Sequence, residues 1–159
     1  MEFSFRLNGA DVSLTGRSDE SLLDLLRLEC GLGGARESCG LGVCGACTVL
    51  VDGQPVSSCL MPAAMARGAE VTTIEGIAGP DGRLDPVQEA FAAERGFQCG
   101  YCTPGMILMT RALLAENPDP SEGEIREYLA GNLCRCGSYE TILRAVRRAA
   151  CGGAPAAGA

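Results

Sequence analysis

The sequence of 159 residues contains no histidine and no tryptophan, and its aromatic residues are limited to three Tyr and four Phe. Without histidine the chain cannot form a Ser-His-Asp triad, a histidine-bound catalytic metal site or a Rieske centre. Any metal that this chain binds must therefore be held by sulfur or carboxylate ligands.

Basic residues and long apolar runs are also scarce. Lys and Arg number 13 against 20 Asp and Glu, a formal net charge of -7 at pH 7. This balance argues against nucleic acid or an anionic membrane as a partner. The N-terminus lacks the basic and apolar regions of a signal peptide, and no apolar run approaches about 18 residues. We therefore expect a cytoplasmic protein, with no membrane and no nucleic acid among its partners.

Cysteine, in contrast, is abundant. Ten cysteines among 159 residues still fall short of the roughly 8–10% that marks a small disulfide scaffold. Thiols in the cytoplasm stay reduced unless a metal binds them. The cysteines are therefore candidates for metal ligands.

The first half of the chain reads as a small, mostly β fold. Alternating apolar residues on either side of Asn8-Gly9 predict a β-hairpin, and residues 22–28 predict a short amphipathic helix. Residues 31–45 are too rich in glycine for regular structure. Further strands are predicted at 48–51, 54–58 and 69–74. The predicted first domain, residues 1–76, has one helix lying on a sheet.

The second half changes to helical periodicity after a predicted linker at 77–84. Helices are predicted to begin at Asp85-Pro86 and Thr103-Pro104, where proline occupies an early position. A capping box of Ser121 and Glu124 predicts a third helix that stops at Gly131, and Ser138 is predicted to cap a fourth. We expect a helical domain at 85–151, a disordered tail at 152–159, and an α+β fold class overall.

A first group of cysteines lies in and after the glycine-rich loop. Cys39, Cys44 and Cys47 are separated by four and two residues, and Cys59 follows after eleven more. This is the plant-type ferredoxin spacing for a 2Fe-2S cluster. Glycine suits such a loop, since backbone without Cβ can turn tightly around a small anionic core and direct N–H groups at its sulfurs. Structural zinc is the less favoured alternative.

A second group combines Cys99 and Cys102 with Cys134 and Cys136, 31 residues further on. Each pair lies just before a predicted helix, so two helix N-termini can offset the negative charge of one site. Four cysteines from two loops suit a tetrahedral zinc ion as well as a cluster. The spacing alone leaves both metals open.

Four stretches resemble the small iron-sulfur subunit of the molybdenum hydroxylases, the xanthine oxidase family. They are residues 40–48 (GLGVCGACT), 72–76 (TTIEG), 98–106 (QCGYCTPGM) and 131–136 (GNLCRC). The similarity extends over residues 3–150 and implies a plant-type ferredoxin-like (β-grasp) domain followed by a four-helix domain, with a 2Fe-2S cluster in each.

The resemblance also implies partners and a direction of electron flow. The cluster of Cys99, Cys102, Cys134 and Cys136 would face the molybdopterin cofactor of a large catalytic subunit, where Gln98 would hydrogen-bond the cofactor and Cys136 would approach its pterin ring. The cluster of Cys39, Cys44, Cys47 and Cys59 would face FAD in a medium subunit. Electrons would pass from molybdenum through both clusters to flavin, in a complex expected to be a dimer of heterotrimers. The substrate, a purine, N-heterocycle, aldehyde or carbon monoxide in this family, would bind to the large subunit.

The sequence departs from many relatives at two places. Ser38 stands where many have glycine, and Gly137-Ser138-Tyr139 stands where many have Thr-Gly-Tyr. Neither supplies a ligand, but both lie where they can alter hydrogen bonds to cluster sulfurs and hence the reduction potential. Cys30 and Cys151 lie outside both motifs and are expected to be ordinary thiols.

We expect no catalytic residue in this chain, whose role would be electron transfer. Two rival interpretations are a zinc-stabilised interaction module and a free, diffusible ferredoxin.

Overall fold

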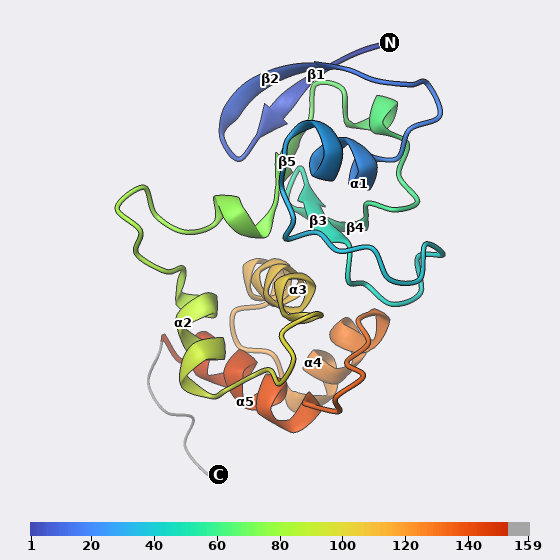
Figure 1. Ribbon diagram of the computed structural model, residues 1–159. Coiled ribbons are helices and arrows are strands. Elements are labelled where there is room, and N and C mark those ends of the chain that lie inside the picture. The colour runs from blue at the N-terminus through green and yellow to red at the C-terminus, as the bar shows by residue number, and fades with distance from the viewer. Residues whose placement is uncertain (153–159) are drawn as a thin grey trace.

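The computed structural model describes residues 1–152 and combines one sheet with several helices (Figure 1). The strands are β1 (Glu2–Leu7), β2 (Ala10–Thr15), β3 (Thr48–Val51), β4 (Gln54–Ser57) and β5 (Glu70–Thr72). They form a sheet in the order β2-β1-β5-β3-β4, in which β1 and β5 are parallel and the other neighbours antiparallel. The tail predicted at 152–159 lies outside the described residues after Gly152.

The hairpin predicted from the alternating pattern is confirmed. Phe3, Phe5 and Leu7 are buried on one face of β1, with exposed residues between them. Asn8 and Gly9 connect the strands with φ angles of 52° and 81°. Positive φ at both central residues gives a turn whose twist matches the strands it joins.

The helix that lies on the sheet differs from the prediction, because more than half of it is π-helical. Helix α1 (Leu22–Asp24) passes directly into a π-helical turn, η1 (Leu25–Glu29), closed by a hydrogen bond from the Cys30 N–H to the Leu25 carbonyl (3.2 Å). Four leucines of this segment are buried against the sheet, at positions 22, 23, 25 and 26. Four apolar positions in five residues are more than the stripe of a short amphipathic helix presents.

The second half contains α2 (Pro86–Ala93), α3 (Thr103–Glu116), α4 (Glu122–Tyr128) and α5 (Tyr139–Ala150). Short 3₁₀ turns occur in both halves of the chain: η2 (Ala63–Ala66), η3 (Ile74–Gly76) and η4 (Leu129–Gly131). The capping box of Ser121 and Glu124 is confirmed. The helix that begins after Ser121 ends as α4 at Tyr128, and the chain continues as the 3₁₀ turn η4 to Gly131. Ser138 precedes α5, but its hydroxyl makes no capping hydrogen bond, so that part of the prediction is wrong.

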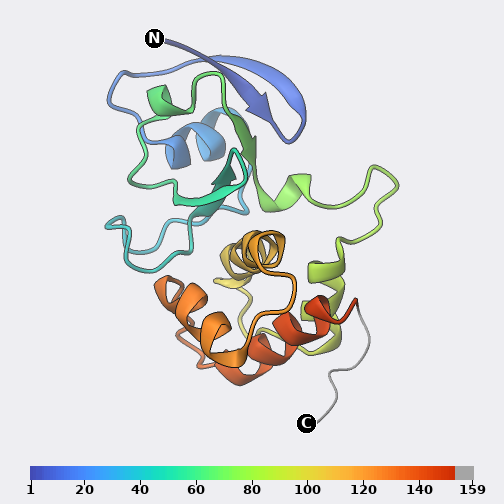
Figure 2. The same cartoon turned by 180° about the vertical axis from the view of Figure 1, so that it is seen from behind.

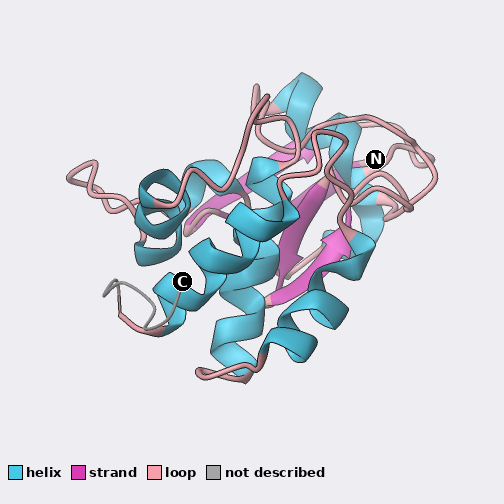
Figure 3. Cartoon of the chain, turned by 90° about the horizontal axis from the view of Figure 1, so that it is seen from below, coloured by secondary structure: helices cyan, strands magenta, loops and turns pink. Residues whose placement is uncertain are grey.

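Two hydrophobic cores meet at α3. One core lies between the sheet and the α1–η1 segment, and the other lies among the helices. Leu50 of β3 and Ile77 pack into the helical core, and α3 lies between the sheet and the other helices of the second half, α4 and α5 (Figures 1 and 2). Seen from below, the helices lie in front of the sheet (Figure 3). Within residues 1–152, no helix is long and apolar enough to cross a membrane.

Candidate metal centres

The first cysteine group is assembled by the β3–β4 hairpin and the loop before it. Cys47 immediately precedes β3, and Cys59 lies two residues after β4. Pairing of Thr48 with Ser57 across these strands brings the two cysteines together. The buried Ser58 hydroxyl donates to the Cys47 carbonyl (2.6 Å), which fixes this end of the hairpin.

The second group is assembled by two helix N-termini. Cys99 and Cys102 precede α3, while Cys134 and Cys136 lie in the segment between η4 and α5. The Tyr139 hydroxyl at the start of α5 accepts a hydrogen bond from the Cys134 N–H (2.9 Å). Both pairs therefore lie at helix starts, as the sequence predicted.

Within each group, the thiols form pairs in which one member shifts the pKa of the other. The pairs are Cys39 with Cys44, Cys47 with Cys59, Cys99 with Cys136, and Cys102 with Cys134. Over residues 1–152, no three His, Cys, Asp or Glu side chains converge on one position for a single metal ion. Two pairs of thiols fit a 2Fe-2S cluster, which takes four thiolates in all, two on each iron.

Backbone N–H groups point at the sulfurs of both groups. Leu41 donates to the Cys39 sulfur (3.3 Å), Tyr101 to the Cys99 sulfur (3.5 Å) and Ser138 to the Cys134 sulfur (3.4 Å). Each donor lies two or four residues beyond its cysteine, so the loops curl back on their own ligands. Such donors stabilise thiolate and the added charge of a reduced cluster.

These contacts divide the thiols into two kinds. Backbone N–H donors, that of Leu41 first, lower the pKa of Cys39 to about 6. Burial, reinforced by the neighbouring Cys47 thiol, raises the pKa of Cys59 to about 11. In the second group the Tyr101 N–H lowers the pKa of Cys99, whereas burial raises that of Cys102 to about 12. Each group thus contains one thiol whose pKa is lowered by backbone donors and one whose pKa is raised by burial.

Cys134 combines both influences. Burial raises the pKa of its thiol, but donors that include the Ser138 N–H and the Cys102 thiol outweigh burial and lower it.

The two cysteine loops touch each other directly. The Leu133 N–H donates to the Cys44 carbonyl (2.9 Å), which links a neighbour of Cys134 to a member of the first group. The buried Asn132 side-chain amide donates to the Gly45 carbonyl (3.2 Å) and lies 3.4 Å from the Thr48 hydroxyl. These contacts fix the position of one loop relative to the other.

A second set of contacts joins the loops on the side of Cys99. The Arg36 guanidinium donates to the Gly100 carbonyl (2.6 Å) and lies 5.2 Å from the centre of the Tyr101 ring. The Tyr101 hydroxyl donates to the Glu37 carbonyl. Cation–π contact and hydrogen bonds therefore hold the first loop against the second.

Gln98 and Cys136 lie together. Gln98 is exposed, and its side-chain amide donates to the Cys136 carbonyl (3.2 Å). The structure therefore places the two residues next to each other, and their contact with the molybdenum cofactor stays a prediction. Cys30 and Cys151 lie outside both groups, the first half-buried and the second exposed at the end of α5.

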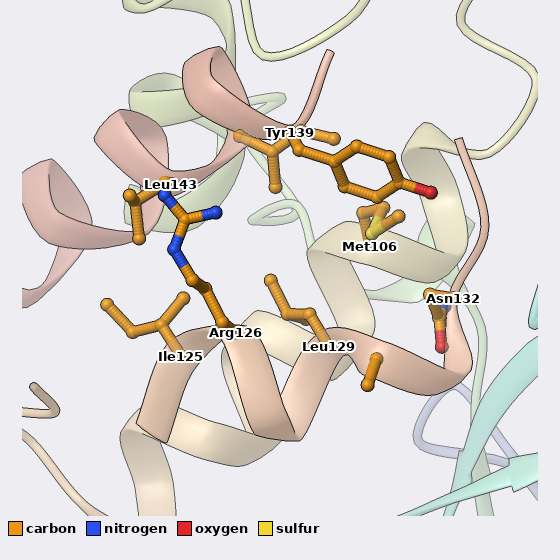
Figure 4. Close-up of a pocket in the computed structure, with 9 residues that line it drawn as sticks. Met106, Ile125, Arg126, Leu129, Asn132, Tyr139 and Leu143 are labelled. Atoms are coloured by element: carbon orange, nitrogen blue, oxygen red, sulfur yellow. The ribbon is translucent and has the colours of Figure 1, made fainter. Parts of the chain in front are cut away.

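A cavity of about 310 Å³ lies among α3, α4 and α5 (Figure 4). Most of its lining is apolar, with Met106 from α3, Ile125 from α4 and Leu143 from α5. Its charged group, Arg126, is already paired with Glu122 and Glu140 (2.9 and 3.0 Å). The cavity therefore offers a mainly apolar surface.

Two groups of four paired thiols, each supplied with backbone donors, define a class of protein that holds iron-sulfur clusters. The sequence matches the family described as 2Fe-2S iron-sulfur cluster binding domain over residues 5–73, and that described as 2Fe-2S binding domain over residues 73–147. The chain thus carries two 2Fe-2S-binding domains.

Similarity to whole proteins is more specific. The chain is 49% identical to one of the subunits of nicotinate dehydrogenase from Pseudomonas putida, covering 92% of this chain and 93% of that one. It is 47% identical to one of the subunits of a probable xanthine dehydrogenase from Bacillus subtilis, covering 92% and 84%. The structure matches quinoline 2-oxidoreductase from Pseudomonas putida 86 with a TM-score of 0.91 and 41% identity, covering 96% of this chain and 95% of that one.

A further match is the aldehyde oxidoreductase from Desulfovibrio desulfuricans, with a TM-score of 0.89 and 39% identity over 96% of this chain and 17% of that one. The chain belongs to the family of 2Fe-2S subunits of the molybdenum hydroxylases.

Sequence reasoning missed the residues that join the two loops. Asn132, Arg36 and Tyr101 received no role, although Asn132 and Tyr101 lie inside the motifs that carry the resemblance. Their partners are more than 60 residues away along the chain, so no local pattern reveals these contacts. Gly45 could have indicated such a contact, because glycine often marks a position where another group approaches the backbone closely.

Proposed function

We propose that this chain is the electron-transfer subunit of a molybdenum hydroxylase complex, with no substrate chemistry of its own. Its relatives include nicotinate and xanthine dehydrogenase subunits. By analogy, a large subunit holds molybdopterin and oxidises the substrate, and a medium subunit holds FAD. Electrons then pass through two 2Fe-2S clusters from molybdenum to flavin. The complex is a dimer of heterotrimers in the cytoplasm.

The eight grouped cysteines are the proposed ligands. Cys99, Cys102, Cys134 and Cys136 hold the cluster that faces the large subunit, and Cys39, Cys44, Cys47 and Cys59 hold the one that faces FAD. A β-grasp domain at 1–76, a linker at 77–84 and a four-helix domain at 85–151 carry these sites. Gln98 and Cys136 lie on the side of the molybdenum cofactor.

The direct contact between the two loops is the observation that carries this proposal. From Cys134 the backbone leads to the Leu133 N–H, and a hydrogen bond of 2.9 Å continues to the carbonyl of Cys44. One residue and one hydrogen bond thus separate proposed ligands of different clusters. A short path of this kind suits transfer of electrons between two sites within one chain.

A 2Fe-2S cluster, when bound, takes up and releases one electron at a time. The chain supplies the environment for this exchange. Leu41, Tyr101 and Ser138 direct N–H groups at the cysteine sulfurs and stabilise negative charge there. Asn132 and Arg36 hold the loops against each other, so the path does not depend on a mobile contact.

Exposed apolar side chains next to both loops fit a chain that works inside a complex. Leu41, Val43 and Leu60 are exposed beside the first group, and Phe97 and Leu133 beside the second. Apolar side chains gathered in this way are typical of surfaces that contact other proteins. Their positions fit two partners that approach opposite cysteine groups.

Metal analysis tests the proposal. The full chain, purified from its native complex, should contain about four iron atoms and four acid-labile sulfides. Two distinct EPR signals should appear on chemical reduction, and Cys102→Ser should remove one of them. Cys151→Ser is the matched control and should keep both, because Cys151 is exposed and lies outside both groups.

The rival interpretations give different results. A zinc-stabilised module would contain zinc in place of half the iron or more. A free ferredoxin would purify alone, whereas the proposed subunit co-purifies with chains that carry molybdenum and flavin. Two EPR signals in Cys102→Ser would refute the ligand assignment.

A further inference from the structure

Ser138 occupies a helix start without capping the helix. Its hydroxyl makes no capping hydrogen bond to α5, although serine at this position ordinarily accepts one from the first turn. The residue is only 5% exposed. Within residues 1–152 its hydroxyl oxygen has no hydrogen-bond partner at all. A buried hydroxyl without a partner is costly, so a native structure that keeps one calls for an explanation.

The chain turns Ser138 back towards Cys134. Gly137, with a φ of 73°, closes a turn in which its N–H donates to the Cys134 carbonyl (3.1 Å). The next N–H, that of Ser138, then reaches the Cys134 sulfur at 3.4 Å. The residue that carries the unpartnered hydroxyl is therefore held against the sulfur of Cys134.

We propose that the Ser138 hydroxyl donates a hydrogen bond to a sulfur of the cluster held by Cys99, Cys102, Cys134 and Cys136, and thereby raises its reduction potential. The inference rests on the ligand assignment made under Proposed function. Ser138 is thus a positioning residue that tunes the cluster and does not ligate it.

The direction of the effect follows from charge. Reduction adds one electron to an anionic cluster, without making or breaking a covalent bond. A donor to sulfur stabilises the more negative, reduced state more than the oxidised state. Loss of the donor should therefore make reduction harder.

Thr103 provides a matched control. It also has a buried hydroxyl without a partner in the described part of the chain, and it directly follows the proposed ligand Cys102. Its side chain, however, lines a mainly apolar cavity with Phe97 and Ile107. Removing this hydroxyl tests whether any change beside the cluster shifts its potential.

The experiment is an EPR-monitored redox titration of the complex that contains the full chain and both clusters. Ser138→Ala should lower the equilibrium constant for reduction of one cluster about tenfold, which corresponds to a fall of about 59 mV in the reduction potential of a one-electron couple. The other cluster should titrate unchanged. Ser138→Thr, which keeps a hydroxyl, should lie close to wild type, and Ser138→Val, which has the same shape as threonine, should match Ser138→Ala. Thr103→Val should leave both potentials unchanged.

Unchanged potentials in Ser138→Ala would overturn the inference, as would an equal shift in Thr103→Val. If Ser138→Ala loses the cluster, the comparison of Ser138→Thr with Ser138→Val decides the question. A failure of the proposed function would appear instead as a different number of EPR signals. The signal shifted by Ser138→Ala must be the one that Cys102→Ser removes, and a mismatch would refute the ligand assignment.

Discussion

At the scale of single residues, the contact between α3 and the first cysteine loop depends on glycine. A Cβ atom added to Gly105 would lie 2.4 Å from the Gly45 carbonyl oxygen, a backbone atom that cannot rotate away. Gly105→Ala should therefore force the helix and the loop apart. We expect a loss of about 1–3 kcal/mol in the free energy of unfolding, measured by denaturant unfolding of the cluster-loaded chain.

Gly123 in α4 is the control for this substitution. A Cβ atom there would have no neighbour within 4 Å. Gly123→Ala should stabilise the chain by about 0.4–1 kcal/mol, because alanine has less conformational freedom to lose on folding. Equal effects of the two substitutions would show that the close approach at Gly105 does not matter.

Gln98 gives a second prediction at this scale. Its amide donates to the Cys136 carbonyl (3.2 Å) and holds the exposed edge of the second cysteine group. Gln98→Ala should lower turnover from substrate to electron acceptor roughly tenfold, the effect of one lost hydrogen bond, while iron content stays the same. Gln54, exposed on β4, supplies the control Gln54→Ala, which should keep full turnover. Normal turnover in Gln98→Ala would contradict the proposed contact with the cofactor.

At the scale of elements, two serines at helix starts behave differently. Ser121 accepts from the Glu124 N–H (3.4 Å), while its own N–H and hydroxyl donate to the Glu124 carboxylate (2.7 and 2.6 Å). Ser121→Ala should therefore destabilise the chain by about 1 kcal/mol. Ser138→Ala should leave the free energy of unfolding nearly unchanged, since Ser138 caps nothing. Unfolding of both variants by urea checks this, and a larger loss at Ser138 would show that it does cap α5.

Local patterns predicted most elements. Alternation around Asn8-Gly9 predicts the first hairpin, and the Ser121 capping box predicts the start of α4. The π-helical turn at Leu25–Glu29 was not predictable, because it depends on how the leucines fit the sheet. The failure at Ser138 has the same origin, since the residue type indicates a cap, whereas the turn before α5 directs the Ser138 N–H at the Cys134 sulfur and leaves the hydroxyl without a capping bond.

Cysteine spacing predicted which candidate ligands belong to each group, but it did not predict which residues of a group lie next to one another. The structure brings the two halves of the second group together across a long separation, where the amide of Gln98, next to Cys99, donates to the Cys136 carbonyl. It also joins the two groups through Leu133 and Cys44. Contacts of this kind arise from packing between the sheet and the helices, so a sequence without the fold does not reveal them.

At the scale of the whole molecule, the two cores are joined where the cysteine loops meet. Arg36 and Tyr101 hold one side of this junction, and Asn132 holds the other. The Gly45 carbonyl also accepts from the Thr48 N–H (3.1 Å) and hydroxyl (2.8 Å), so it keeps partners even without Asn132. Loss of the Asn132 amide should therefore loosen the junction without unfolding either loop.

Asn132→Ala tests whether this junction sets the distance between the proposed clusters. The magnetic interaction of two reduced clusters falls with the cube of their separation, so a looser junction should reduce the splitting of their EPR signals at low temperature. The free energy of unfolding should fall by about 1 kcal/mol. Asn117→Ala is the matched control, since Asn117 bonds to Glu124 and Asp119 at the far end of α3; it should preserve the splitting. An unchanged splitting in Asn132→Ala, with both signals present, would mean that the Arg36 and Tyr101 contacts hold the clusters in place by themselves.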